Sequence, residues 1–271
     1  MSDIQVSIYG SCNRPHMWQW FYDNVSMNHI NFQIIFVGNV EPKFTLPDNF
    51  HFIYSNVKPL QCMHIAANMC EGEVLQAMVD DCQSSPYSLD IMYELYKTQN
   101  NYKALISPKF FGVTSTPKDI NELQKIADST MNDVGYLHVV YDDPRSLKIL
   151  PSGGMMSSRI FHELGGYDKR FIWGGSDLDL FVRAQIFGAD VIYCENAWIV
   201  ERKDLCPGWN SYSDKSKKYN DERLKLFRSL WFKDGIESIE NFLEKRASDL
   251  DQFEDTDTIG LISQGPTGEW D

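Results

Sequence analysis

Runs rich in apolar residues alternate with polar turns through the first third of the chain. Four such runs lie at residues 4–9, 32–37, 51–55 and 74–79. The second run is continuous, which is typical of a strand covered on both faces. Residues 16–25 and 60–70 have helical spacing, and Pro15 stands where a helix begins. This order predicts an α/β fold with a mixed, mostly parallel sheet flanked by helices.

The later part of the chain continues this alternation. Helices are predicted at residues 86–100, 118–131, 213–232 and 236–247. Strands are predicted at residues 103–106, 136–141, 191–194 and 198–200. A further strand and a short helix are expected after Gly153-Gly154. After Asp249 the sequence is acidic and interrupted by glycine and proline, which is typical of a loosely attached tail.

Polar residues follow several of the predicted strands. They are Ser11, Asn13 and Arg14 after the first strand, Asn39 after the second and Asp80-Asp81 after the fourth. Parallel strands place their carboxyl ends at one edge of a sheet, and ligands bind there. We therefore expect these residues to meet at a binding site.

A loop between two glycine pairs precedes a predicted helix in the second half of the chain. The pairs are Gly165-Gly166 and Gly174-Gly175, and the helix is expected to begin at Ser176. Ser176 suits an N-cap, while Asp177 and Asp179 suit the positive end of a helix. A buried face is predicted from the spacing of the apolar residues Leu178, Phe181, Val182 and Ile186. The carboxylates then point away from the core, where they either cap a surface helix or line a cleft.

Composition narrows the class of protein. The 38 acidic residues exceed the 25 lysines and arginines and give a net charge of −13, which argues against a protein that coats nucleic acid. Six cysteines without a C-x-x-C pair favour a reducing compartment. The chain begins directly with a strand pattern, and no apolar run approaches the ~20 residues of a membrane span. These features predict a soluble, cytoplasmic protein with no membrane span.

Several common catalytic motifs are absent from the sequence. It contains no G-x-S-x-G elbow, P-loop or G-x-G-x-x-G, which weakens hydrolase, kinase and dehydrogenase interpretations. The six histidines lack metal-site spacing, so they are expected to be packed or surface residues.

The glycine-rich segment resembles the acceptor-side motif of inverting GT-A glycosyltransferases of the family-2 group. That motif is Gly-Gly-Phe-Asp followed by Glu-Asp-x-Asp-Leu and an arginine, which align with residues 165–168, residues 176–180 and Arg183. Trp173-Gly174-Gly175 is similar to a loop of the β-1,4-galactosyltransferases. The resemblance implies that Asp177 is the general base, although Ser176 replaces the glutamate of the motif. It also places Trp173, Gly174, Gly175 and Asp179 at the substrate.

The first half is similar to the donor-binding half of the same family. Residues 6–15 match its first strand and Pro-Thr-Tyr-Asn-Arg turn, which implies nucleotide contacts by Ser11, Asn13 and Arg14. Asn39 stands in place of the family's acid that often contacts the nucleotide base. Residues 71–81 resemble the run that ends in Asp-x-Asp, which implies that Asp81 binds the metal and Asp80 the ribose or sugar. A slip of one residue in this alignment exchanges those roles, and the structural alternative is an acidic turn after an edge strand.

Three assignments from the resemblance have two interpretations each. Glu201 stands where the family often has a metal-binding histidine, and hard oxygen ligands suit Mn²⁺ or Mg²⁺. It is equally placed to pair with Arg202 or with a nearby lysine. Asp179 and Arg183 form either a structural pair or a substrate contact, and Trp173 either stacks on the acceptor or packs.

The resemblance implies an inverting, metal-dependent glycosyltransferase that uses a nucleoside diphosphate sugar, of which a UDP-sugar is the first choice. Its GT-A catalytic domain would span residues 1–204, with a donor half at about 1–110 and an acceptor half at about 111–204. A helical extension at 205–248 and an acidic tail at 249–271 would follow.

Two other functions stay open on the sequence alone. One is a sugar nucleotidyltransferase, although the turn after the first strand is poor in glycine for that class. The other is a protein that retains the fold, has lost catalysis and only binds sugar nucleotides. The acceptor is also open between a glycan, a protein and a modified nucleic-acid base, and the basic stretch at residues 202–233 is a candidate to contact it. The sequence leaves the oligomeric state undecided.

Overall fold

The computed structural model describes residues 3–130, 135–136, 148–149, 153–168, 170–171, 176–206 and 225–226. Its centre is an eight-stranded sheet with the order β3-β2-β1-β4-β9-β6-β10-β5. The strands are β1 Val6–Ser11, β2 Phe32–Gly38, β3 Phe50–Tyr54, β4 Val74–Ala77, β5 Cys82–Ser84, β6 Leu105–Val113, β9 Met155–Ser157 and β10 Val191–Arg202. A separate two-stranded sheet pairs β7, Gly135–Tyr136, with β8, Lys148–Ile149.

The large sheet is mixed but mostly parallel, as the sequence predicts. β1 runs parallel to β2 and β4, β2 runs parallel to β3, and β6 runs parallel to β10. Two strands reverse direction. β9 lies antiparallel between β4 and β6, and β5 lies antiparallel to β10 at the edge. The carboxyl ends of β1 and β4 therefore lie side by side. Arg14 follows the end of β1 within a few residues, and Asp80 follows the end of β4 in the same way.

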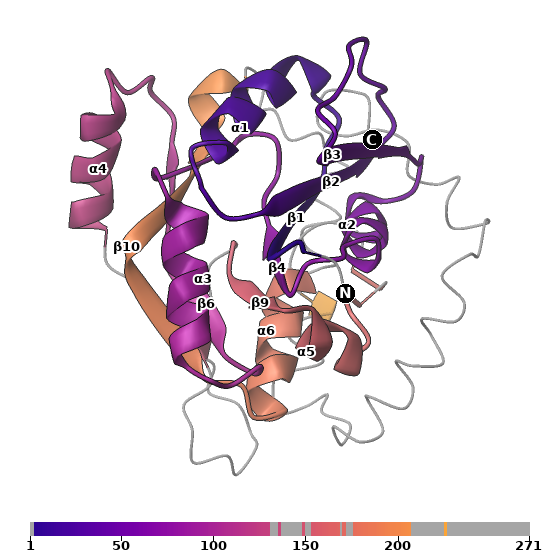
Figure 1. Cartoon of the computed structure of the whole chain (residues 1–271), viewed down its shortest axis with the longest axis vertical. Coiled ribbons are helices and arrows are strands. Elements are labelled where there is room, and N and C mark those ends of the chain that lie inside the picture. Colours follow the sequence, from indigo (N-terminus) through magenta and orange to yellow (C-terminus); the bar gives the residue numbers. More distant parts are fainter. Residues whose placement is uncertain are drawn as a thin grey trace.

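Helices cover both faces of the sheet (Figure 1). The helices are α1 Trp18–Val25, α2 Pro59–Asn68, α3 Ser88–Thr98, α4 Ile120–Ser129, α5 Ser158–Glu163 and α6 Ser176–Ile186, with short 3-10 turns η1 Pro15–Met17 and η2 Lys203–Leu205. α1 and α3 pack with Ile8, Phe36 and Ile106 in one core. α2, α5 and α6 pack with Tyr9 and Leu75 in the second core on the other face.

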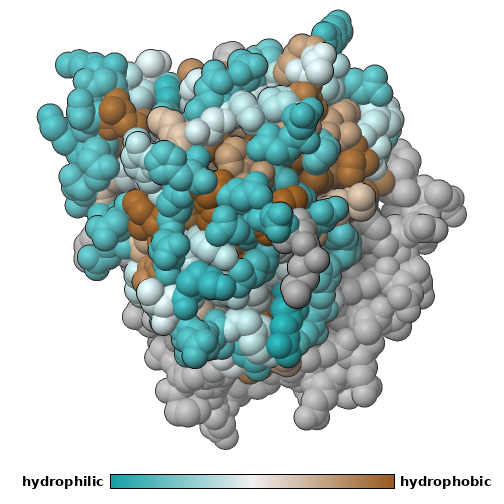
Figure 2. Space-filling model, in the orientation of Figure 1, coloured by the Kyte–Doolittle hydropathy of each residue, from teal (hydrophilic) through white to brown (hydrophobic). Residues whose placement is uncertain are grey.

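Alternating side chains of β1 explain how one strand serves both cores. Ile8 points into the core beneath α1, whereas Tyr9 points toward α2 and α5. α4 forms a smaller cluster through Leu123 and Ala127, which pack against Trp198 of β10. Figure 2 shows that the visible outer face is mainly hydrophilic, with hydrophobic side chains in separate groups. No helix in the described ranges is both long and apolar enough to cross a membrane.

The predicted elements are found within a few residues of their expected positions, with three differences. The strand expected at 103–106 extends to Val113 in β6. The runs at 191–194 and 198–200 form one strand, β10, whose pairing register shifts between Cys194 and Trp198. β5 and β8 were not predicted, because three or two residues are too few to show a pattern. The helices expected at 213–232 and 236–247, the acidic tail and most of the 136–141 strand lie outside the described residues.

Gly72 offers a test of the packing between β1 and β4. A Cβ atom at Gly72 would lie 2.6 Å from the Ser7 Oγ and 2.7 Å from the Ser7 backbone nitrogen. Overpacking of this kind costs about 1–3 kcal/mol, so Gly72→Ala should lower the free energy of unfolding by that amount in urea denaturation. The control is Gly112→Ala, whose Cβ would meet only the flexible Lys203 side chain at 3.4 Å. Equal stability of the two variants would contradict this packing.

Candidate active site

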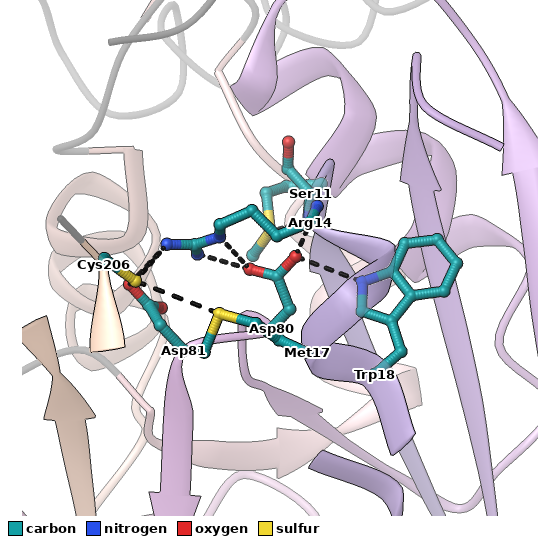
Figure 3. A network of polar contacts seen from close by, with 8 residues as sticks. Ser11, Arg14, Met17, Trp18, Asp80, Asp81 and Cys206 are labelled. Carbon is teal, nitrogen blue, oxygen red and sulfur yellow. Dashed lines mark hydrogen bonds and ion pairs between the residues drawn. The ribbon is translucent and has the colours of Figure 1, made fainter. Parts of the chain in front are cut away.

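Arg14 holds two neighbouring carboxylates at the ends of β1 and β4. Its Nε donates to Asp80 Oδ1 at 2.8 Å, and its Nη2 contacts the same oxygen. Its Nη1 donates to Asp81 Oδ2 at 3.0 Å (Figure 3). The three side chains meet because β1 and β4 are adjacent and parallel. The sequence prediction that Arg14, Asp80 and Asp81 lie together is therefore confirmed.

Asp80 is fully engaged by protein groups. Its Oδ2 accepts hydrogen bonds from the Arg14 backbone nitrogen at 3.0 Å and from Trp18 Nε1 at 3.1 Å. The side chain is completely buried, which raises its pKa, while the Arg14 guanidinium acts in the opposite direction. Asp80 thus ties the turn after β1 to the first residue of α1. Its contact with a ribose or sugar stays a prediction.

The two carboxylate oxygens of Asp81 differ in their contacts. Its Oδ2 faces Arg14, whereas Oδ1 is buried and has no hydrogen-bond partner among the described residues. Its backbone carbonyl accepts from the Arg202 nitrogen at 2.8 Å, which anchors the residue to the end of β10. A buried carboxylate oxygen without a partner is costly, so a ligand at Oδ1 would remove that cost.

Cys206 belongs to the same cluster, although it is not among the site residues predicted from the sequence. Its Sγ accepts from Arg14 Nη1 at 2.8 Å and lies 3.7 Å from Asp81 Oδ2 (Figure 3). Burial raises the pKa of the thiol to about 11, so it is neutral at physiological pH. No local pattern marks Cys206, because η2 brings it to the site from 192 residues along the chain.

Glu201 lies close to Asp81 across the sheet edge. It pairs in register with Cys82, the residue that follows Asp81. Burial raises the pKa of the Glu201 carboxyl, and the negative charge of Asp81 adds to that rise. Lys203 Nζ, 3.1 Å from Glu201 Oε2, opposes it. The structure thus shows the predicted lysine pairing and also places the charge of Glu201 near that of Asp81.

The other predicted nucleotide contacts lie on the strand ends nearby. The Ser11 backbone nitrogen donates to Met63 Sδ at 3.1 Å, and Asn13 is half-buried in the turn that leads to Arg14. Asn39 Nδ2 donates to Asn56 Oδ1 at 3.2 Å, next to the end of β3. Ser11 ends β1, Asn13 follows β1 and Asn39 follows β2, two parallel strands whose carboxyl ends lie side by side. Their contact with a nucleotide stays a prediction.

The start of α6 differs from the sequence expectation. Asp177 is half-exposed, as predicted, but the idea that both carboxylates point away from the core is wrong for Asp179. Asp179 is completely buried and accepts from Arg183 Nε at 2.9 Å. Its interpretation as a structural partner of Arg183 is therefore the one that the structure supports. Trp173, Gly174 and Gly175 lie outside the described residues.

Two tyrosines near Asp177 were also missed. Tyr9 Oη of β1 and Tyr167 Oη lie 2.5 Å apart. Burial raises the pKa of both phenols, and the charge of Asp177 contributes to both rises. A cleft shared by Asp177 and Asp81 stays a prediction.

The arrangement around Arg14 predicts a large stability cost for losing its charge. Arg14→Met would leave the buried Asp80 and Asp81 without a countercharge, which costs about 3–5 kcal/mol. Urea denaturation measures this loss. Arg159→Met is the control, because its pair with Glu163 is 65% and 31% exposed and should contribute little. Similar losses in both variants would contradict the importance of the buried cluster.

Structural comparison places this site on a known fold. The chain matches the crystal structure of S. aureus TarS 1-349 with a TM-score of 0.53 and 10% identity, covering 96% of this chain and 84% of that one. The same values hold for TarS in complex with UDP. GalNAc-T7 with UDP, GalNAc and Mn²⁺ matches with a TM-score of 0.56 and 12% identity, covering 96% of this chain and 59% of that one.

Sequence comparison adds no closer relative. No protein-family model and no curated protein sequence matches the chain. The likeness therefore lies in the architecture, in which helices flank a mixed, mostly parallel sheet. This α/β architecture matches the GT-A fold of glycosyltransferases.

Proposed function

We propose that this protein is an inverting glycosyltransferase that moves a sugar from a UDP-sugar to an acceptor hydroxyl. The observation that carries the proposal is the cluster of Arg14, Asp80 and Asp81 at the meeting ends of β1 and β4 within a GT-A fold. Open α/β sheets bind their ligands at these strand ends. UDP is present in both matched proteins, and one of them also contains Mn²⁺.

The acids at the sheet edge fit a divalent cation that shares its coordination with a diphosphate. The described residues contain no group of three or more His, Cys, Asp or Glu side chains arranged to hold a metal. Asp81 Oδ1 and the Glu201 carboxylate would instead supply two hard oxygen ligands, as Mn²⁺ or Mg²⁺ prefers. When bound, the cation neutralises the charge that develops on the leaving diphosphate.

Protein residues provide the rest of the chemistry. Arg14 holds Asp81 through Oδ2 alone, so Asp81 Oδ1 remains for the ligand. Asp80 in turn holds Arg14 in place. Asp177 accepts the proton of the acceptor hydroxyl as that oxygen bonds to the anomeric carbon. The bond from the anomeric carbon to the diphosphate breaks on the opposite face, and its electron pair leaves with UDP. Proton transfer of this kind contributes about 10²–10⁴-fold to a rate.

The domain division follows from this assignment. Residues 1–204 form the catalytic domain, in which the first 110 residues bind the donor and the remainder binds the acceptor. The acceptor is a glycan, a protein or a modified nucleic-acid base. A protein that only binds sugar nucleotides is the second candidate, because Arg14 already engages both aspartates and Ser176 replaces the usual glutamate. Assaying UDP release from a panel of UDP-sugars with Mn²⁺ separates the two.

Asp177→Asn tests the catalytic base. The amide cannot accept the proton, so UDP release should fall by about 10²–10⁴-fold, while UDP affinity measured by calorimetry stays unchanged. Asp119→Asn is the control, because Asp119 caps α4 by accepting from the Glu122 nitrogen and asparagine caps a helix equally well. Full turnover by the Asp177 variant would rule out this residue as the base.

Asp81→Asn tests the cation site. Calorimetry with Mn²⁺ should show UDP binding weakened by at least about tenfold, which corresponds to about 1.4 kcal/mol. In EDTA the wild type and the variant should bind UDP equally weakly, because the lost contact acts through the cation. If Mn²⁺ improves UDP binding equally in both proteins, Asp81 is not a ligand.

A further inference from the structure

Two buried phenols join segments that are far apart in the sequence. Tyr9 lies in β1, Tyr167 lies in the turn after α5, and their Oη atoms are 2.5 Å apart. The residues are only 2% and 3% exposed. They are separated by 158 positions, so the bond links the donor half to the acceptor half of the proposed enzyme. Because both hydroxyls are buried, either of them would be costly to leave unpaired.

The turn that carries Tyr167 has little freedom to move. Gly165 and Gly166 have φ values of +74° and +71°, which favour glycine. A Cβ atom at Gly166 would lie 2.6 Å from His64 Cε1. The Tyr167 backbone nitrogen donates to His64 Nδ1 at 3.3 Å, which attaches the turn to α2. The turn is therefore held by two contacts, one with His64 of α2 and one with Tyr9 of β1.

Arg183 connects the same turn to the first turn of α6. Its Nη1 donates to the Leu164 carbonyl at 2.7 Å and its Nη2 to the Gly166 carbonyl at 2.6 Å. Its Nε donates to Asp179 Oδ2 at 2.9 Å. Asp179 lies two residues after Asp177 in that helix. A guanidinium with fixed donors thus sets the helix start against the glycine turn.

We propose that Tyr9, Tyr167, Arg183 and Asp179 form a brace that holds the first turn of α6, and with it Asp177, against β1. Tyr9 and Tyr167 are then positioning residues of the transfer reaction. The inference rests on the proposed function, since it assigns the brace to the alignment of its base. Tyr9 lies in β1 and Arg14 lies in the turn after that strand, so the brace would connect Asp177 to the Arg14 cluster through β1. The contribution of the Asp177 charge to the pKa of both tyrosines agrees with this placement.

Tyr167→Phe is the first variant to test, because it removes one hydroxyl and keeps the ring that packs on Phe161. UDP release from a panel of UDP-sugars, with Mn²⁺ present and water as acceptor, gives kcat and KM. Since small misplacements of a catalytic group are costly, kcat should fall by about tenfold, with KM and UDP affinity unchanged. Tyr9→Phe should show the same fall, and the double variant should show little more.

Tyr93→Phe is the matched control. Tyr93 lies on α3, outside the brace, and its hydroxyl donates to Glu73 Oε2 at 2.6 Å. It should keep the wild-type kcat even where it lowers stability as much as Tyr167→Phe does. A kcat of Tyr167→Phe within twofold of wild type, or an equal fall in Tyr93→Phe, would overturn the proposal.

Hydrogen exchange tests the brace independently of activity. In Tyr167→Phe the amides of residues 180–183 in α6 should exchange faster than in wild type, while those of α3 keep their rates. Unchanged exchange in α6 would overturn the brace even if the protein is a glycosyltransferase. If the wild type releases UDP from no UDP-sugar while α6 exchange responds as expected, the proposed function fails and the brace remains as a structural link.

Discussion

The guanidinium of Arg14 balances two buried carboxylates where β1 and β4 end, and the proposed donor site depends on that balance. Asp80 and Asp81 are 0% and 1% exposed, so each would be costly as an isolated charge. Asp80 accepts from Arg14 and Trp18 through both oxygens. Asp81 shares only one oxygen with Arg14, and its buried Oδ1 has no hydrogen-bond partner among the described residues. The two adjacent aspartates therefore differ in their contacts, and the proposed cation site uses that difference.

β1 and the turn after it carry residues of both proposed sites. The strand carries Tyr9 toward the α2 and α5 face, and its following turn carries Arg14 toward α1. The proposed donor contacts and the link to the acceptor half thus stem from one short, fully paired strand. Arg183 extends the link into α6 through the glycine turn. In the proposed reaction the base and the leaving group act on opposite faces of one carbon. A single strand that joins the Arg14 cluster to the α6 link suits that requirement.

The sequence predicted the parts of the structure that follow from local patterns. Apolar runs located the strands, and the rule that parallel strands end together correctly grouped Arg14 with Asp80 and Asp81. It did not reveal Cys206 or the Tyr9 and Tyr167 pair, because those contacts arise from packing of segments 158 or more positions apart. The burial of Asp179 was missed because helical spacing was counted from apolar residues alone. The spacing of four residues to Arg183 did indicate the ion pair, which the structure shows buried.

A crystal structure with UDP and Mn²⁺ would show whether the donor binds at the ends of β1 and β4. We expect Mn²⁺ bound to Asp81 Oδ1 and to the diphosphate, with the Asp177 carboxylate facing the same cleft from the side of the acceptor. UDP bound away from the ends of β1 and β4, or Asp177 on the opposite side of the molecule from the diphosphate, would contradict it.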